Sequence, residues 1–215
     1  MQPATNKALF ITIEGGEGVG KTTNMAYIRD FMRRHDIQHI HTREPGGTPL
    51  AEQLRELLLA KRDEPVDEMA ELLMVFAARA QHLNAKILPA LGAGKTVLCD
   101  RFTDATYAYQ GYGRGLSLRL IEQLEQTVQR GVHPDLTILL DLPVDVGLQR
   151  ASQRAALDRF ECEKIAFFNR VREGYLARAK LNSERFAVID ASRDLVTVQA
   201  DIEQVLMRFY QLEAM

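Results

Sequence analysis

The feature that most constrains this chain is a glycine-rich segment near its N-terminus, residues 15–22, which reads GGEGVGKT. It completes the pattern G-x-x-x-x-G-K-[ST], in which backbone N–H groups and a helix N-terminus cradle phosphate groups. An apolar, β-branched run at 8–13 precedes the motif, and a helix-like run at 22–31 follows it. Strand, glycine loop and helix form the context that this motif requires, and a mere glycine turn is the disfavoured alternative. The segment therefore predicts that the chain binds a nucleoside triphosphate.

Within the motif, Lys21 is expected to reach the β- and γ-phosphates, and Thr22 is expected to bind Mg²⁺. The loop and the first turn of its helix supply the expected ATP-binding residues, which are Gly15, Gly16, Glu17, Gly18, Val19, Gly20, Lys21, Thr22 and Thr23.

Composition restricts the class of protein. At 215 residues with 46% apolar residues, the chain is expected to form one α/β domain. The net charge of −2 offers no basic field that would favour a nucleic-acid partner. Cys99 and Cys162 form no disulfide framework. Because neither a signal peptide nor a membrane span is found in the sequence, we expect a cytoplasmic enzyme without a membrane partner.

Short apolar runs alternate with longer helical patterns along the chain. Strands are expected at 8–14, 38–42, 96–100, 135–141 and 186–190. Helices are expected at 22–34, 50–60, 67–91, 117–130, 144–156, 160–181 and 195–210, with loops at 63–65 and 111–115. Strands separated by helices predict a five-stranded parallel, doubly wound sheet flanked by helices. No linker interrupts residues 1–215, and ligands of such sheets bind beyond the carboxyl ends of the strands.

The residues that follow two of these strands are candidates for the site. After the second strand, Pro45 and two glycines force a turn that brings Arg43 and Glu44 to the binding edge, although a surface turn with a solvated ion pair is an equal alternative. After the third strand, Asp100 could hold Mg²⁺ or its water, and Arg101 could grip a phosphate. An ion pair that only caps the strand is the alternative for these two residues.

The helix expected after the fourth strand carries Arg150 and Arg154 on one face, because residues four apart are neighbours on a helix. The phosphate loop contains no second cation besides Lys21, only Glu17. Phosphoryl transfer needs positive charge at the moving group. We therefore expect Arg150, Arg154 and Arg159 to supply it from a mobile flap, although such a basic helical face is usually only solvated.

Five segments together resemble the signatures of bacterial thymidylate kinases, in the form with basic residues in the lid rather than in the phosphate loop. They are IEGGEGVGKTT at 13–23, TREPGGT at 42–48, FAAR at 76–79, DRF at 100–102 with AYQG at 108–111, and LDRFE at 157–161. The Asn-Lys-x-Asp motif of switch GTPases and the second loop lysine of partition-type ATPases are missing from the sequence. The resemblance implies a P-loop kinase fold and transfer of the ATP γ-phosphoryl group to dTMP, a step toward dTTP. It also implies Mg²⁺ as cofactor and a homodimer.

The same resemblance implies individual roles. The arginine-bearing segment 147–160 would be the lid that closes over ATP, and Arg150 would contact ATP. Lys21, Arg101, Arg154 and Glu17 would be the catalytic residues. We expect Arg154 to be the main lid arginine because it lies one turn beyond Arg150. The residues expected to bind the substrate are Glu17, Arg43, Pro45, Arg55, Val75, Phe76, Arg79, Arg101, Thr106, Tyr109 and Gln110.

Thymidylate kinases often place an aromatic residue four positions before the base-reading arginine. Here that position is Val75, and the aromatic residue is Phe76, which lies about 100° further around a helix. Either Phe76 stacks on the base through altered geometry, or Val75 supplies only apolar contact. Two alternative functions also stay open, namely a related kinase that reads a different base and a slow nucleotide-binding regulator.

Overall fold

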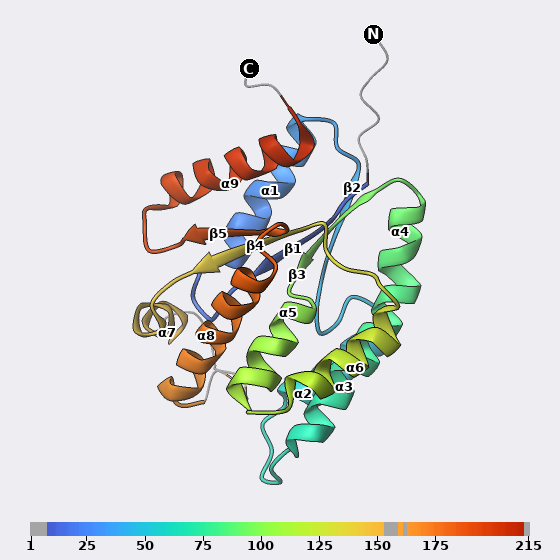
Figure 1. The fold of residues 1–215 in the computed structure, drawn as a ribbon, viewed down its shortest axis with the longest axis vertical. Coiled ribbons are helices and arrows are strands. Elements are labelled where there is room, and N and C mark those ends of the chain that lie inside the picture. The colour runs from blue at the N-terminus through green and yellow to red at the C-terminus, as the bar shows by residue number, and fades with distance from the viewer. Residues whose placement is uncertain (1–7, 153–158, 161–162, 213–215) are drawn as a thin grey trace.

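A parallel five-stranded sheet forms the centre of the protein (Figure 1). The computed structural model describes residues 8–152, 159–160 and 163–212. The strands are β1 (Phe10–Glu14), β2 (His39–Arg43), β3 (Thr96–Asp100), β4 (Leu136–Asp141) and β5 (Phe186–Asp190), in the order β2-β3-β1-β4-β5. The expected fold class and all five strands are confirmed, with boundaries shifted by at most two residues.

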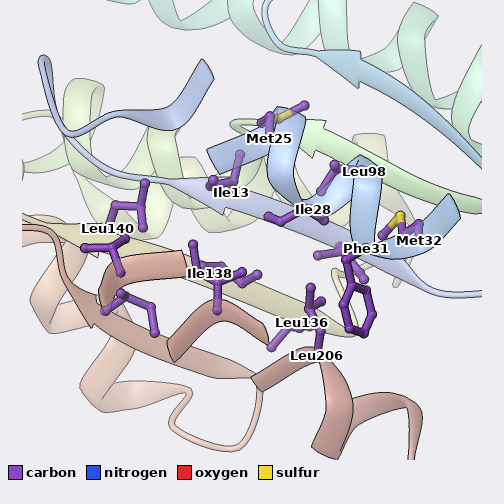
Figure 2. Packing of buried hydrophobic residues seen from close by; sticks show 14 of the residues in the cluster. Ile13, Met25, Ile28, Phe31, Met32, Leu98, Leu136, Ile138, Leu140 and Leu206 are labelled. Carbon is purple, nitrogen blue, oxygen red and sulfur yellow. The ribbon is translucent and has the colours of Figure 1, made fainter. Parts of the chain in front are cut away.

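Helices cover both faces of the sheet. One face carries α1 (Lys21–Arg34) and α9 (Leu195–Tyr210), which pack on the apolar side chains of β1 and β4 (Figure 2). The helical segments on the other face and around the sheet edge are α2 (Pro49–Leu59), α3 (Glu68–His82), α4 (Leu88–Gly92), α5 (Thr103–Thr106), α6 (Leu118–Gln129), α7 (Val144–Ser152) and α8 (Ile165–Leu181). Strands covered on both sides must be apolar throughout, and β1 is buried along its whole length.

Three helical expectations need correction. The single helix expected at 67–91 is divided into α3, a π-helical segment (Leu83–Ile87) and α4. Residues 111–113 of the expected loop belong to a second π-helical segment (Tyr107–Gly113), because α8 packs against this stretch and holds it helical despite its glycines. The helix expected from 160 begins at Ile165, and the end of the helix expected to reach 156 lies outside the described residues.

The register of the sheet brings three chain segments to one edge. Asp100, the last residue of β3, pairs with Ile13 of β1 on one side and with Arg43 of β2 on the other. The three strands therefore end at the same level, and the loops that follow them meet beyond that edge. Among the helices of the described residues, none combines the length and apolar character needed to cross a membrane.

Candidate functional site

A pocket of about 280 Å³ opens where these loops meet. Most residues expected from the sequence line it: Glu17, Gly18, Val19, Gly20, Lys21, Thr22, Arg43, Pro45, Arg55, Val75, Arg79, Asp100, Arg101, Thr106, Tyr109 and Gln110. The pocket thus joins the phosphate loop, the loop after β2, α3 and the helical stretch after β3 in one cavity.

The phosphate loop depends on a glycine at one tight contact. Gly18 has a φ of +69°, and a Cβ atom there would lie 1.9 Å from the carbonyl oxygen of Gly147 on α7. No other residue fits both the left-handed backbone and this close approach. At the start of α1, Lys21 Nζ donates to the carbonyl oxygens of Gly15 and Gly16, at 3.1 and 2.8 Å. The ammonium group thereby lies along the loop whose N–H groups would face phosphate.

Glu17 lies at the centre of the pocket wall. Its Oε1 accepts hydrogen bonds from Arg101 Nη2 at 2.6 Å and from the Tyr109 hydroxyl at 2.7 Å. Burial by itself would raise the pKa of Glu17, but Arg101 and Lys21 outweigh burial and lower the pKa to about 2. The Arg101 guanidinium also lies 4.7 Å from the centre of the Tyr109 ring. Three expected site residues are thus joined by hydrogen bonds and by the charge pairing of Glu17 with Arg101.

Arg101 adopts an unusual backbone conformation. Its φ of +66° lies in the left-handed region, which is costly for a residue with a side chain. Such strain is concentrated at functional sites, where the surrounding structure enforces it. Here the Arg101 N–H donates to the carbonyl oxygen of Ile13 at 3.0 Å, so the adjacent β1 strand helps to hold the turn.

Asp100 carries an unsatisfied oxygen. Its Oδ1 atom is buried and has no hydrogen-bond partner, although buried polar atoms are nearly always paired. Thr22 lines the same pocket. A hydroxyl and a carboxylate are hard oxygen donors of the kind that suits Mg²⁺. Within the described ranges, no group of three or more His, Cys, Asp or Glu side chains could hold a metal ion by itself.

Arg79 is a buried cation, and one of its nitrogen atoms has no hydrogen-bond partner among the described residues. It is 1% exposed, and its guanidinium carbon lies 5.0 Å from the ring centres of both Phe76 and Phe102. Its Nε donates to Glu44 at 2.7 Å and its Nη2 donates to Thr106 at 2.9 Å, but Nη1 has no partner. An unpaired buried donor is costly unless a ligand satisfies it.

The structure separates Val75 from Phe76. Val75 lines the pocket, whereas Phe76 packs in an apolar cluster with Leu72, Tyr107 and Ile121. The position of Phe76 does not support the expected direct contact with substrate, because the helical rotation between neighbouring residues turns its ring into the core. Phe76 instead packs against the guanidinium of Arg79.

Two arginines around the loop after β2 are held by contacts between that loop and α2. Arg43, the last residue of β2, donates to Glu52 on α2 at 2.7 Å, and Arg55 on α2 donates from Nη1 to the carbonyl oxygen of Pro45 at 3.0 Å. Both arginines line the pocket. Together with Arg101 they give the lining of the cavity a positive character suited to an anion.

Some expected residues lie elsewhere. Gly15 and Gly16 line a small adjoining cavity, and Thr23 is exposed on α1. Arg150 does not line the pocket, because its Nη1 donates to the carbonyl oxygen of Ala191 beyond β5 at 3.3 Å. Arg154 lies outside the described residues.

Sequence reasoning assigned no role to three residues that complete the site. Phe160 lines the pocket, and its ring meets Tyr109 edge-on with 5.9 Å between ring centres. Glu44 orients Arg79, and Glu71 on α3 accepts a hydrogen bond from Gln110 at 2.9 Å. Two of them could have been found from the sequence, because Glu44 lies in the TREPGGT segment and Phe160 in the LDRFE segment. Glu71 had no signal, because its partners are distant in sequence.

Glu14, at the end of β1, is fully buried next to this site. It accepts hydrogen bonds from the Phe102 N–H at 2.7 Å and from the Tyr175 hydroxyl at 2.9 Å. Burial and the nearby Asp104 carboxylate raise the pKa of Glu14 to about 8. The native protein therefore retains a proton there at pH values where an exposed carboxyl group has released it.

Comparisons with known proteins identify the family of the chain. The description of the thymidylate kinase family matches residues 13–202. A thymidylate kinase of Teredinibacter turnerae is 63% identical over 200 residues, which cover 93% of this chain and 98% of that protein. Thymidylate kinases of Chromohalobacter salexigens and Pseudomonas putida are 60% and 59% identical, over 90% and 92% of this chain and 92% and 94% of theirs.

The raised pKa of Glu14 predicts a pH dependence of stability. The folded state binds a proton that the unfolded state releases above about pH 4.5, so the free energy of unfolding should decline as pH rises toward about 8 and then level off. The decline approaches about 1.4 kcal/mol per pH unit. The Glu14→Gln variant, which has no proton to release, should lack this decline in urea unfolding between pH 5 and 9. Parallel curves for the two proteins would contradict the prediction.

The Glu17→Gln variant serves as a control, because the pKa of Glu17 is lowered in the folded protein whereas that of Glu14 is raised. Because the pKa of Glu17 is lowered to about 2, its ionisation stabilises the fold above about pH 4.5, and that contribution is lost as pH falls toward 2. This substitution should therefore leave the decline between pH 5 and 8 in place.

Proposed function

This chain belongs to the thymidylate kinase family, and we propose that its residues divide the phosphorylation of dTMP by ATP between two sides of the 280 Å³ pocket. The reaction transfers the γ-phosphoryl group of ATP to dTMP and gives dTDP and ADP. One observation carries the proposal: a single pocket joins Lys21 and Thr22 of the phosphate loop to Arg79, a buried guanidinium with an unpaired donor.

The acceptor side would bind dTMP. Arg43, Arg55 and Arg101 would surround its phosphate, and the presence of all three in the lining of one cavity supports this role. Glu17 would accept a hydrogen bond from the 3′-hydroxyl group. Tyr109, which is fixed by its own bond to Glu17, would pack under the deoxyribose, where a 2′-hydroxyl group would clash.

The base would bind against α3 and the helical stretch after β3. The unpaired Nη1 of Arg79 would donate to the O4 carbonyl oxygen of thymine. Thr106 and Gln110 would contact the base at the same wall, and Val75 would supply apolar contact. A donor that is already buried has little hydration to lose when the base covers it. The arrangement therefore favours a base that accepts a hydrogen bond at this position.

The donor side would bind ATP along residues 15–23. Lys21 would turn from the loop carbonyl groups toward the β- and γ-phosphates. Thr22 and Asp100 would hold Mg²⁺ or its bound water, and the unsatisfied Oδ1 of Asp100 supports this assignment. When bound, Mg²⁺ neutralises charge that develops on the phosphate oxygens.

The acceptor phosphate is already an anion and needs little help from a general base. Catalysis is then a matter of holding two anions in line and neutralising their charge. Arg101 is suited to this task because Glu17 and Tyr109 lock its guanidinium between the phosphate loop and the acceptor end of the pocket. Lys21 supplies the second fixed positive charge.

The remaining positive charge would come from a lid near residues 147–160, with Arg150 toward ATP and Arg154 toward the transferring group. One arginine in such a position contributes about 10³–10⁵ in rate. The family resemblance also supports a single domain over 1–215, a homodimer and a cytoplasmic location without nucleic-acid or membrane partners. The lid would exclude water from ATP when it closes.

Substrate selectivity tests the assignment of the pocket. In a coupled ADP-release assay with dTMP, dUMP, dCMP, UMP and AMP, kcat/KM for dCMP should be lower than for dTMP by about 10⁴ or more, because buried polar groups would be left unpaired. For dUMP, kcat/KM should be lower than for dTMP by only about 10–200-fold, which is the effect of losing the contacts of one methyl group. Equal turnover of dCMP and dTMP would show that Arg79 and Gln110 do not read the base.

The metal assignment predicts that Asp100→Asn weakens the apparent affinity for Mg²⁺ by about 10–100-fold, the loss that removal of an outer-shell partner of a bound metal typically causes. Turnover measured against Mg²⁺ concentration at saturating ATP and dTMP checks this. The matched control is Asp30→Asn, an exposed site on α1 paired with Arg33, which should leave the Mg²⁺ dependence unchanged. Identical Mg²⁺ curves for Asp100→Asn and the parent enzyme would exclude the assignment.

The lid assignment predicts that Arg154→Ala lowers kcat more than tenfold while the protein stays folded, because the transferring group loses a cation. Arg33→Ala, which removes an exposed arginine on α1, is the control and should retain full turnover. A loss below tenfold for Arg154→Ala would assign the main role to another residue.

A further inference from the structure

Glu71 is a buried carboxylate that lies outside the pocket and next to one of its walls. It is completely inaccessible to solvent on α3. Its Oε1 accepts a hydrogen bond from Gln110 Nε2 at 2.9 Å. Arg114 donates to both carboxylate oxygens, each at 3.3 Å, and Arg159 donates to Oε2 at 2.6 Å. The mechanism described above does not use this group.

The chemistry of this cluster determines how the Gln110 amide is turned. Two guanidinium groups, which can only donate, balance the charge of the Glu71 carboxylate. An ionised carboxylate can only accept, so the NH₂ group of Gln110 is the one end of the amide that can pair with it. The reverse orientation would set the amide oxygen against Oε1, with two acceptors in contact and no proton between them. Glu71 therefore permits one orientation of the amide.

That orientation decides what Gln110 offers to a ligand. Gln110 lines the pocket and is only 3% exposed. With one N–H of Nε2 bonded to Glu71, the opposite end of the amide, the accepting carbonyl oxygen Oε1, is the end directed away from Glu71 and available to a ligand. Arg79 presents the opposite character through its unpaired Nη1. The wall thus combines a donor and an acceptor.

This combination matches thymine and opposes cytosine. Thymine carries an acceptor at O4 and a donor at N3–H, whereas cytosine carries a donor at its amino group and an unprotonated, accepting N3. We infer that Glu71 is a positioning residue that sets base selectivity by fixing the Gln110 amide with its oxygen toward the base. This inference rests on the contact between Gln110 and the base proposed above.

The test compares kcat/KM for dTMP and dCMP in Glu71→Gln. A glutamine at 71 has the same shape but carries both a donor and an acceptor, so the amide of Gln110 can pair with it in either orientation. The ratio of kcat/KM for dTMP to that for dCMP should fall at least tenfold. If both substrates lose activity by the same factor, Glu71 is only structural and the inference is overturned.

A second variant addresses stability. Loss of the negative charge leaves Arg114 and Arg159 without their shared partner, which could prevent folding of Glu71→Gln. Glu71→Asp keeps the charge beside both arginines but withdraws the oxygen from Gln110. It should lower the selectivity ratio as well, and an unchanged ratio in Glu71→Asp overturns the inference.

Two controls separate the possible failures. Glu163→Gln removes a carboxylate that pairs with Arg114 without a hydrogen bond to Gln110, and it should keep the selectivity ratio. In a Gln110→Ala background, Glu71→Gln should change the ratio no further. If Gln110→Ala alone leaves selectivity intact, the proposed contact with the base fails. If it lowers selectivity while the Glu71 variants do not, only the positioning role fails.

Discussion

Burial of carboxylates around the pocket is the constraint on which the rest of the site depends. A carboxylate removed from water must be met by donors, or its burial costs several kcal/mol. Four glutamates near the pocket receive hydrogen bonds from residues that are distant from them in the sequence. The donors are Phe102 and Tyr175 for Glu14, Arg101 and Tyr109 for Glu17, Arg79 for Glu44, and Gln110, Arg114 and Arg159 for Glu71. These bonds tie α3, the helical stretch after β3 and α8 to the edge of the sheet. The side chains that face substrate are positioned because they are the donors.

Two buried polar atoms of the pocket have no hydrogen-bond partner within the part of the protein that the structure describes. Arg79 Nη1 and Asp100 Oδ1 are buried polar atoms with no partner in the structure. Arg79 Nη1 lies at the wall assigned to the base, and Asp100 Oδ1 lies in the same pocket as the phosphate loop. Both ligands would therefore bind to groups that the fold has already removed from water. Such groups reward a matching ligand strongly and penalise a mismatched one, which suits a kinase that must reject related nucleotides.

Much of the fold and of the site followed from local sequence. The strands β1, β3, β4 and β5 were predictable because each is a short, largely apolar run, and the phosphate loop because its glycines and lysine are contiguous. The helical stretch over Thr103–Gly113 was missed, since its glycines and polar residues are typical of a loop and α8 stabilises it only in the folded protein. The roles of Val75 and Phe76 could not be separated in advance either. A helix rotates by about 100° per residue, so its exact placement decides which of the two faces the pocket.

By itself, the sequence determined that this protein has a parallel sheet, a phosphate loop and arginines at the ends of its strands, because those features are written in neighbouring residues. The tertiary structure decided which of these groups are paired and which remain available. The hydrogen bond from Tyr175 to Glu14 spans 161 residues, and the one from Gln110 to Glu71 spans 39. Contacts of this kind depend on how helices pack against the sheet. Only the packed chain therefore shows that Arg79 keeps a donor, that Asp100 keeps an acceptor and that the Gln110 amide donates to Glu71.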